Sequence, residues 1–201
     1  MALLDHICYN SIKLLFKINI ICEEIITMVQ IESNLGKQER VYELLDRLGV
    51  EYEVIHHPPM FTQADSDGRE VRDGVVIFKN LFLRNKDKSR YYLYSLPLTK
   101  RADLVAVANA LCETRLSFGN EDALLEKLNI QRGSVSFLNV IGTESTDVTL
   151  LIDTSAFDCD RIGVHPNDNT ATVILKPQDI RKILDACGVE YKFFATSSPT
   201  Q

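Results

Sequence analysis

The chain has 201 residues, which suits one globular domain with an extension. Its 45% apolar and 25% charged residues are ordinary for a soluble protein that forms a core. The formal net charge of −6 argues against a protein coated for non-specific nucleic-acid binding.

The cysteines are odd in number and include no C-x-x-C pair, so they fit neither a disulfide framework nor a zinc site. Reduced thiols are their simplest interpretation, and they predict a cytoplasmic protein without a metal. The five are Cys8, Cys22, Cys112, Cys159 and Cys187.

Residues 1–30 differ from the rest, because their apolar residues recur at helical spacing and are interrupted by charges. The charges exclude a membrane span, and no apolar core ends in the small-residue cleavage site of a secretory signal. Two interpretations stay open: an amphipathic helix docked on the body, or a segment upstream of a true start at Met28. We expect an extension over residues 1–30, a domain over 31–196 and a disordered tail over 197–201.

Helix and strand signals follow along the chain and predict an α/β (α+β) protein. We expect a single domain with a mixed, mostly antiparallel central sheet or partial barrel flanked by helices. The expected helices are Lys37–Leu48, Asp103–Leu111 with a cap at Thr99, Glu121–Leu128 and Gln178–Cys187. The expected strands are Val50–Ile55, Val75–Leu83 with a hairpin partner ending at Pro97, an apolar run to Ile141, Val148–Ile152, Ala171–Leu175 and Val189–Phe194.

One short pattern occurs twice. Residues 45–52 (LDRLGVEY) recur as residues 184–191 (LDACGVEY), and each copy reads as a helix end, a glycine stop and a strand. Two copies are too few for a solenoid. We expect these two helix–strand units to frame one sheet.

The hairpin of residues 75–98 contains an unusual polar pair, Lys79-Asn80, in the middle of an apolar strand. Burying an ammonium group without a partner is costly. Lys79 therefore either snorkels to water from an edge strand or lines a pocket that receives an anion. A local twist or bulge at this pair would aim both side chains at one pocket, whereas a straight strand would count against the site.

The hairpin is also basic. Between residues 79 and 101 there are seven basic residues and one acid, a local charge of +6 on a body that carries −12. Such a patch is typical of a protein that touches a few phosphates, although basic residues on edge strands also prevent aggregation. The basic residues are Lys79, Arg84, Lys86, Lys88, Arg90, Lys100 and Arg101.

The common catalytic motifs are absent from the sequence: there is no G-x-S-x-G elbow, P-loop or H-E-x-x-H. A thiol nucleophile formed by Cys159 and His165 is conceivable. The remaining candidates are binding groups, which work by positioning and electrostatics. They are Lys79, Asn80, the loop at Gly133, His165 and Asn169.

Three segments are familiar in combination: Phe78–Arg84 (FKNLFLR), Gly133–Ser136 (GSVS), and His165-Pro166 followed by residues 169–172 (NTAT). In their order and spacing, they resemble the YbaK-like, aminoacyl-tRNA synthetase-associated domain. Within that family the freestanding prolyl-tRNA editing deacylases are the closest match. The resemblance covers nearly everything after Met28.

The resemblance implies an enzyme that hydrolyses alanine wrongly esterified to tRNA(Pro), after the synthetase has acted. It implies water as the nucleophile, no metal or cofactor, and as partners the acceptor end of tRNA(Pro) and prolyl-tRNA synthetase. The physical need is clear, because a pocket built for proline cannot strongly reject a smaller amino acid. An aminoacyl ester is already activated, so aligning a water with the substrate's own ribose hydroxyl suffices.

The resemblance also implies roles for individual residues. Lys79 is expected to hold the terminal phosphate region and Asn80 the end adenosine or the aminoacyl group. The loop at Gly133 and Ser134 is expected to present backbone groups to the substrate, and His165 to hold the terminal nucleotide. Further substrate contacts are expected at Phe78, Ser136, Phe137, Pro166 and Asn169, and tRNA contacts at Arg84, Lys86, Lys88 and Arg90.

One residue departs from the family pattern, which commonly reads Gly-x-x-x-Pro, because the fifth residue here is Phe137. Either the loop keeps its shape without proline, or the amino-acid pocket is altered. The alternatives to an alanine deacylase are therefore a deacylase for cysteine or serine, or a non-catalytic module that binds tRNA or the synthetase.

Overall fold

The computed structural model describes residues 36–59, 74–141 and 147–195. Contacts within the chain separate Lys37–Gln201 from Met1–Gly36, and the fold below is that of the former. The expected extension over residues 1–30 and the expected tail over 197–201 lie outside the described residues.

The strands are β1 (Tyr52–His56), β2 (Val75–Asn85), β3 (Tyr91–Pro97), β4 (Leu116–Phe118), β5 (Val148–Asp153), β6 (Arg161–Val164), β7 (Ala171–Leu175) and β8 (Tyr191–Phe194). The α-helices are a helix of residues 36–48, α2 (Leu104–Ala110), α3 (Glu121–Leu128) and α4 (Asp179–Cys187). Two short 3-10 helices are η2 (Phe137–Val140) and η3 (Thr154–Asp158). No helix in these described ranges is long and apolar enough to cross a bilayer.

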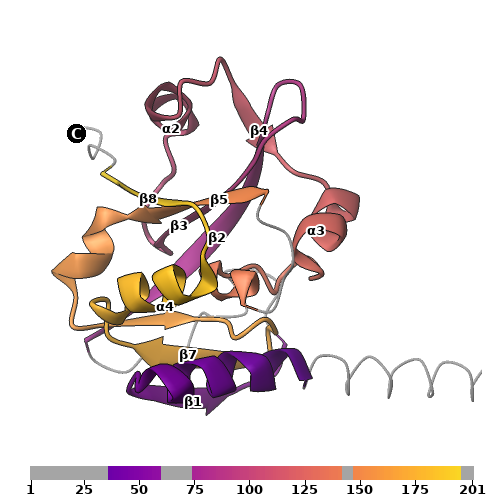
Figure 1. Ribbon diagram of the computed structural model, residues 1–201. Helices are drawn as coiled ribbons and strands as arrows, with labels where there is room; N and C mark the ends of the chain where they lie inside the picture. Colours follow the sequence, from indigo (N-terminus) through magenta and orange to yellow (C-terminus); the bar gives the residue numbers. More distant parts are fainter. Residues whose placement is uncertain (1–35, 60–73, 142–146, 196–201) are drawn as a thin grey trace, which may run out of the picture. The chain divides into compact units, whose positions relative to one another are not determined.

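The strands form one mixed sheet in the order β1-β7-β6-β2-β3-β5-β8, and β4 pairs with β2 off this path (Figure 1). Among the described pairings, four are antiparallel and three are parallel. The expected α+β domain with a mixed sheet is therefore confirmed.

The two edges of this sheet are β1 and β8. Each follows a helix that ends at a glycine, Gly49 before β1 and Gly188 before β8. The repeated sequence pattern therefore frames the sheet, as expected.

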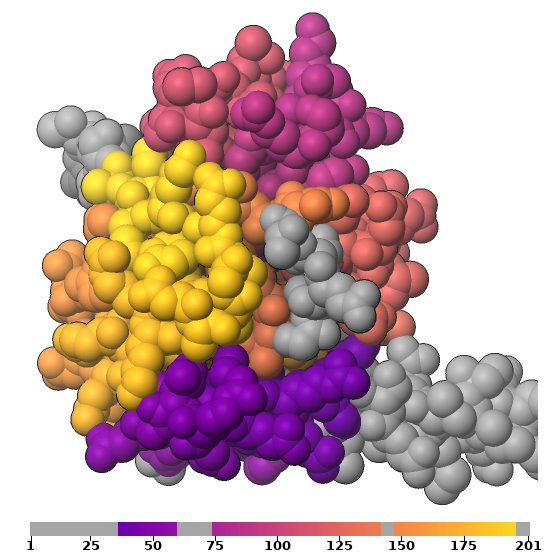
Figure 2. Space-filling model, in the orientation of Figure 1, coloured from indigo at the N-terminus to yellow at the C-terminus, as the bar shows by residue number. Residues whose placement is uncertain are grey.

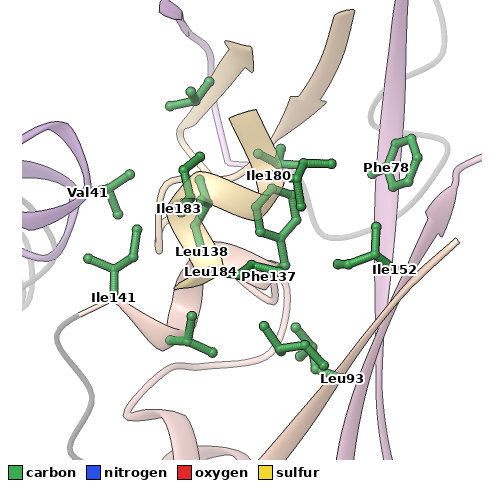
Figure 3. Packing of buried hydrophobic residues seen from close by; sticks show 14 of the residues in the cluster. Val41, Phe78, Leu93, Phe137, Leu138, Ile141, Ile152, Ile180, Ile183 and Leu184 are labelled. Carbon is green, nitrogen blue, oxygen red and sulfur yellow. The ribbon is translucent and has the colours of Figure 1, made fainter. Parts of the chain in front are cut away.

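Helices cover both faces of the sheet. On one face the helix of residues 36–48 and α4 lie side by side (Figure 2), and their apolar side chains join the larger core cluster with η2. Figure 3 shows Val41, Ile183 and Phe137 pointing into that cluster. On the other face, α2 packs Val107 and Ala108 against buried side chains of β2 and β3.

Two expectations for local structure are wrong. The apolar run to Ile141 is not a strand, because Ser136 caps η2 there. Helix α2 is capped by Asp103 rather than Thr99, since the Asp103 carboxylate accepts hydrogen bonds from the backbone N–H groups of Val105 and Ala106, both at 3.0 Å.

Candidate functional site

The pairing of β2 changes along its length. On one edge it pairs with β3 from Phe78 to Arg84. On the other edge it pairs with β6 over Val75–Ile77 and with β4 over Leu83–Asn85. Within the described part of the chain, no strand pairs with this second edge between Ile77 and Leu83, so the sheet has a gap there.

A cavity of about 770 Å³ opens at this gap. Its volume falls within the range of small-molecule sites, roughly 300–1,000 Å³. Its walls come from β2, the junction of β4 and α3, the loop at Gly133, and the residue after β6. The lining residues are Ile77, Phe78, Lys79, Asn80, Leu81, Phe82, Leu98, Phe118, Gly119, Asn120, Glu121, Leu124, Arg132, Gly133, Val135 and His165.

Backbone groups of β2 also face this cavity. At the mouth of the hairpin, the Leu98 N–H donates to the Ile77 carbonyl at 2.8 Å, so odd-numbered residues of β2 turn their backbone toward β3. Backbone direction alternates along a strand, so Phe78 and Asn80 turn their N–H and C=O groups toward this second edge. The parallel pairing of Ile77 with Gly163 uses the Phe78 N–H. The Phe78 carbonyl and both backbone groups of Asn80 lie at the gap, where they are available to a ligand.

Lys79 and Asn80 do not form a bulge. Each residue of this part of β2 opposes one residue of β3, with Lys79 opposite Leu96 and Asn80 opposite Ser95. The two side chains therefore start on opposite faces of a regular strand, and the expected bulge is wrong. Both residues nevertheless line the cavity, because it lies at the open edge of the strand, where both faces meet.

Lys79 is a half-buried cation. Its Nζ donates to the Leu98 carbonyl at 2.9 Å, and burial lowers the pKa of its ammonium group. Among the described residues, no carboxylate lies within ion-pair distance of this ammonium group. An uncompensated positive charge at a cavity favours the anion-site interpretation over a snorkelling lysine.

Asn80 is held by its opposite neighbour. The hydroxyl of the fully buried Ser95 donates to Asn80 Oδ1 across the β2–β3 pair. With Oδ1 engaged by a donor, the Nδ2 group is the part of the amide that can donate to a ligand.

The loop at Gly133 is held by buried hydrogen bonds of the Asn139 side-chain amide. Gly133 lines the cavity at φ = 94°, a left-handed conformation that favours glycine. Behind it, Asn139 Oδ1 accepts from the Ser136 N–H, and Asn139 Nδ2 donates to the Ser134 carbonyl at 3.1 Å. The same Nδ2 donates to Asn167 Oδ1 at 2.8 Å, which ties this loop to the loop after β6.

Phe137 lies on the far side of this loop from the cavity. Its side chain is fully buried in the larger core cluster beside Ile180 (Figure 3). Ser136 is fully buried too, and neither side chain lines the cavity. The loop thus keeps its shape without proline, and the expected substrate contacts of Ser136 and Phe137 have no support in this geometry. Ser134 is likewise buried and does not line the cavity.

His165 follows β6 and lines the cavity. Its Nδ1 lies 2.9 Å from the Ala171 carbonyl, which makes Nδ1 the protonated nitrogen and leaves Nε2 as an acceptor. Burial lowers the pKa of this imidazole, so it is neutral at pH 7. His57, a residue that the sequence did not single out, places its ring 5.8 Å from that of His165, and its Nε2 lies 3.0 Å from Thr172 Oγ1.

Pro166 and Asn169 are buried and do not line the cavity. Their loop is anchored by the buried Asp168, whose Oδ1 accepts from the Thr170 N–H at 2.8 Å and from Gln38 Nε2 at 3.1 Å. These residues support His165 rather than contact a ligand in the cavity.

The basic turn between β2 and β3 (magenta, top of Figure 2) is partly neutralised. Lys86 and Lys88 are exposed, whereas the Arg84 guanidinium donates to a backbone carbonyl. Arg90 forms an ion pair at 3.5 Å with Glu113. Lys100, further along, bonds at 2.9 Å to a buried carboxylate and is not available to a phosphate.

Cys159 and His165 stand on either side of β6, and only His165 lines the cavity described above. The Cys159 thiol donates to the Ala156 carbonyl at 3.0 Å, and burial raises its pKa, which disfavours the reactive thiolate. The arrangement therefore does not support a thiol nucleophile.

Comparison with known proteins extends these observations. A family model described as an aminoacyl-tRNA editing domain matches residues 57–183. The prolyl-tRNA editing protein ProX of Acetoanaerobium sticklandii is 32% identical over 159 residues, which cover 79% of this chain and 97% of that protein. Prolyl-tRNA synthetase associated domain-containing protein 1 of Mus musculus is 29% identical over 153 residues, covering 73% of this chain and 90% of that protein.

Two crystal structures share the fold. One is of a hypothetical protein, with a TM-score of 0.60 at 15% identity, covering 78% of this chain and 97% of the other. The second is provisionally assigned as a trans-editing enzyme for prolyl-tRNA synthetase, with a TM-score of 0.58 at 18% identity, covering 80% and 98%. By the family match and the similarity to ProX, the chain belongs to the aminoacyl-tRNA editing domain family.

Proposed function

We propose that this protein removes alanine from mischarged tRNA(Pro) in the cytoplasm, in trans to prolyl-tRNA synthetase. Membership of the editing family makes the chain a hydrolase of aminoacyl-tRNA esters. The choice of alanine and of tRNA(Pro) is the further step. It rests on the resemblance of the sequence motifs to prolyl-tRNA editing deacylases.

The observation that carries the proposal is the uncompensated Lys79 cation beside an unpaired strand edge. The acceptor end of an aminoacyl-tRNA carries groups that complement both the cation and the strand edge. Its phosphates match the Lys79 ammonium group, and its ester and amino groups match the Phe78 carbonyl and the backbone N–H and carbonyl of Asn80.

In the proposed reaction, a water oxygen attacks the ester carbonyl carbon and the bond from that carbon to the ribose oxygen breaks. The water proton passes to the departing ribose oxygen, so that free alanine and tRNA with an intact terminal hydroxyl are the products. The Asn80 backbone N–H at the strand edge stabilises the oxyanion, and the neutral Nε2 of His165 accepts a hydrogen bond from the terminal ribose. The ester is activated enough for this alignment to suffice.

Apolar side chains line the part of the cavity next to these groups and are proposed to limit the size of the amino acid. They are Phe78, Phe82, Leu124 and Val135. A cavity that admits alanine and excludes proline corrects the error that the synthetase cannot avoid.

The proposal is tested by a deacylation panel. Alanyl-, seryl-, cysteinyl- and prolyl-tRNA(Pro) are incubated with the pure protein, and we expect alanine to be released fastest and prolyl-tRNA to be spared. Fastest release of serine or cysteine would reassign the substrate. Binding of tRNA without release of any amino acid would instead identify a non-catalytic module.

Phe137→Leu should leave this selectivity unchanged, because the Phe137 side chain lies in the core and not in the cavity. We expect the free energy of unfolding to fall by about 1 kcal/mol and the alanine-to-serine ratio of kcat/KM to stay at the wild-type value. Phe78→Leu is the matched control, since it makes the same change at a buried position that does line the cavity. A shifted ratio in Phe137→Leu with none in Phe78→Leu would contradict the assignment of the pocket.

A further inference from the structure

Phe118 is the most exposed phenylalanine or tyrosine of the described residues. The residue is 61% exposed, and no ring contact within the described ranges includes it. Phe157, the next most exposed, packs on Phe193 at 5.0 Å between ring centroids. A single exposed aromatic residue needs no explanation by itself. Phe118 differs in how its backbone is held and in the groups that lie beside it.

The backbone of Phe118 is fixed on both sides. In β4 the residue pairs with Leu83 of β2, and the following Gly119 N–H donates to the Phe82 carbonyl at 2.9 Å. A Cβ on Gly119 would lie 2.4 Å from the Phe82 ring, so only glycine permits this approach. Asn120 then caps α3 through the Ala123 N–H. An exposed ring on so constrained a backbone loses little conformational entropy when it contacts a ligand.

Phe118 also lines the same cavity as Lys79, Asn80 and Gly133. An aromatic ring and an uncompensated cation in one cavity are the two elements of single-strand nucleic-acid sites, where bases stack on rings and phosphates meet basic groups. The cavity volume of about 770 Å³ leaves room for a nucleoside beside the ester.

We infer that Phe118 is a stacking platform for the terminal adenine of the tRNA acceptor end. The inference rests on the proposed function, because the adenine is joined to the same ribose that carries the aminoacyl ester. When the ester is bound beside the Gly133 loop and Lys79, its adenine therefore lies no further from them than the length of one nucleoside. Phe118 supplies the apolar planar surface there.

Steady-state kinetics on alanyl-tRNA(Pro) test the role. Phe118→Leu, which keeps apolar bulk but removes the aromatic face, is expected to raise KM about 10-fold with kcat unchanged, and Phe118→Tyr to restore the wild-type KM. Leu125→Ala is the control, because Leu125 is 55% exposed on α3 but does not line the cavity. A wild-type KM in Phe118→Leu, or an equal rise in Leu125→Ala, overturns the inference.

A binding measurement separates this inference from the proposed function. A tRNA(Pro) with 2-aminopurine as its terminal base and alanine in a non-hydrolysable amide linkage is expected to lose fluorescence on binding to the wild type and to Phe118→Tyr, but not to Phe118→Leu. Equal quenching by all three proteins overturns the stacking role even if the ester is hydrolysed. Quenching that depends on the aromatic ring upholds the role even if the panel shows no hydrolysis.

Discussion

Lys79→Met is expected to lower kcat/KM for alanyl-tRNA(Pro) on the order of 10²-fold and to leave the protein folded. The loss is expected because the Lys79 ammonium group is half-buried at the cavity and has no carboxylate partner among the described residues. Methionine has a similar unbranched stem and needs no solvation, so the melting temperature should stay the same or rise. Single-turnover deacylation and thermal unfolding measure the two effects.

The salt dependence identifies what Lys79 binds. If its partner is a phosphate of the unpaired acceptor end, the slope of log KM against log salt concentration should become smaller by about 0.7 in Lys79→Met. Lys182→Met is the matched control, because Lys182 is an exposed lysine on α4 outside the cavity. An unchanged slope in Lys79→Met, together with wild-type activity, would show that Lys79 is only a snorkelling residue.

Much of the fold could be predicted because its signals are local. The hairpin of β2 and β3 has two long apolar strands around a charged turn, and α3 shows its apolar face and boundaries directly in the sequence. The repeat at residues 45–52 and 184–191 also indicated the two edge strands of the sheet, since each copy contains a helix end, a glycine and the start of a strand.

The missed elements are those whose local signal is weak. Strand β4 has three residues and β6 has four, one of them Gly163, so neither is long enough to show alternation. Residues 137–140 are buried from all sides, and such a run does not distinguish a strand from a short helix.

The cavity could not be predicted for the same reason. It exists because β6 and β4 both stop short on one edge of β2, and these are the two strands that the sequence did not reveal. Sequence motifs therefore identified Lys79, Asn80, Gly133 and His165, which the structure brings to one cavity, but not the gap that gathers them. They also did not separate these residues from Ser136 and Phe137, which support the loop from behind.

Asn139→Ala is expected to cost several kcal/mol of stability, about 1–3 kcal/mol for each buried group left unpaired. Asn139 is 1% exposed and satisfies the Ser136 N–H, the Ser134 carbonyl and Asn167 Oδ1. Its loss frees the loop at Gly133 from the loop that carries His165. Because both loops face the reacting ester, kcat should fall about 10-fold while KM changes little, measured at a temperature where the variant is fully folded.

Asn85→Ala separates this positioning role from a loss of stability alone. Asn85 is also buried, at 4% exposed, and its side chain binds the Ser89 and Arg90 N–H groups within the β2–β3 turn. The Asn85→Ala substitution therefore removes a comparable set of hydrogen bonds, but none of these bonds reaches the cavity loops. We expect Asn85→Ala to lower the melting temperature and keep the wild-type kcat. If both variants lose kcat in proportion to their stability, Asn139 only holds the fold together; if Asn139→Ala alone loses kcat, its amide aligns the two loops on which the chemistry depends.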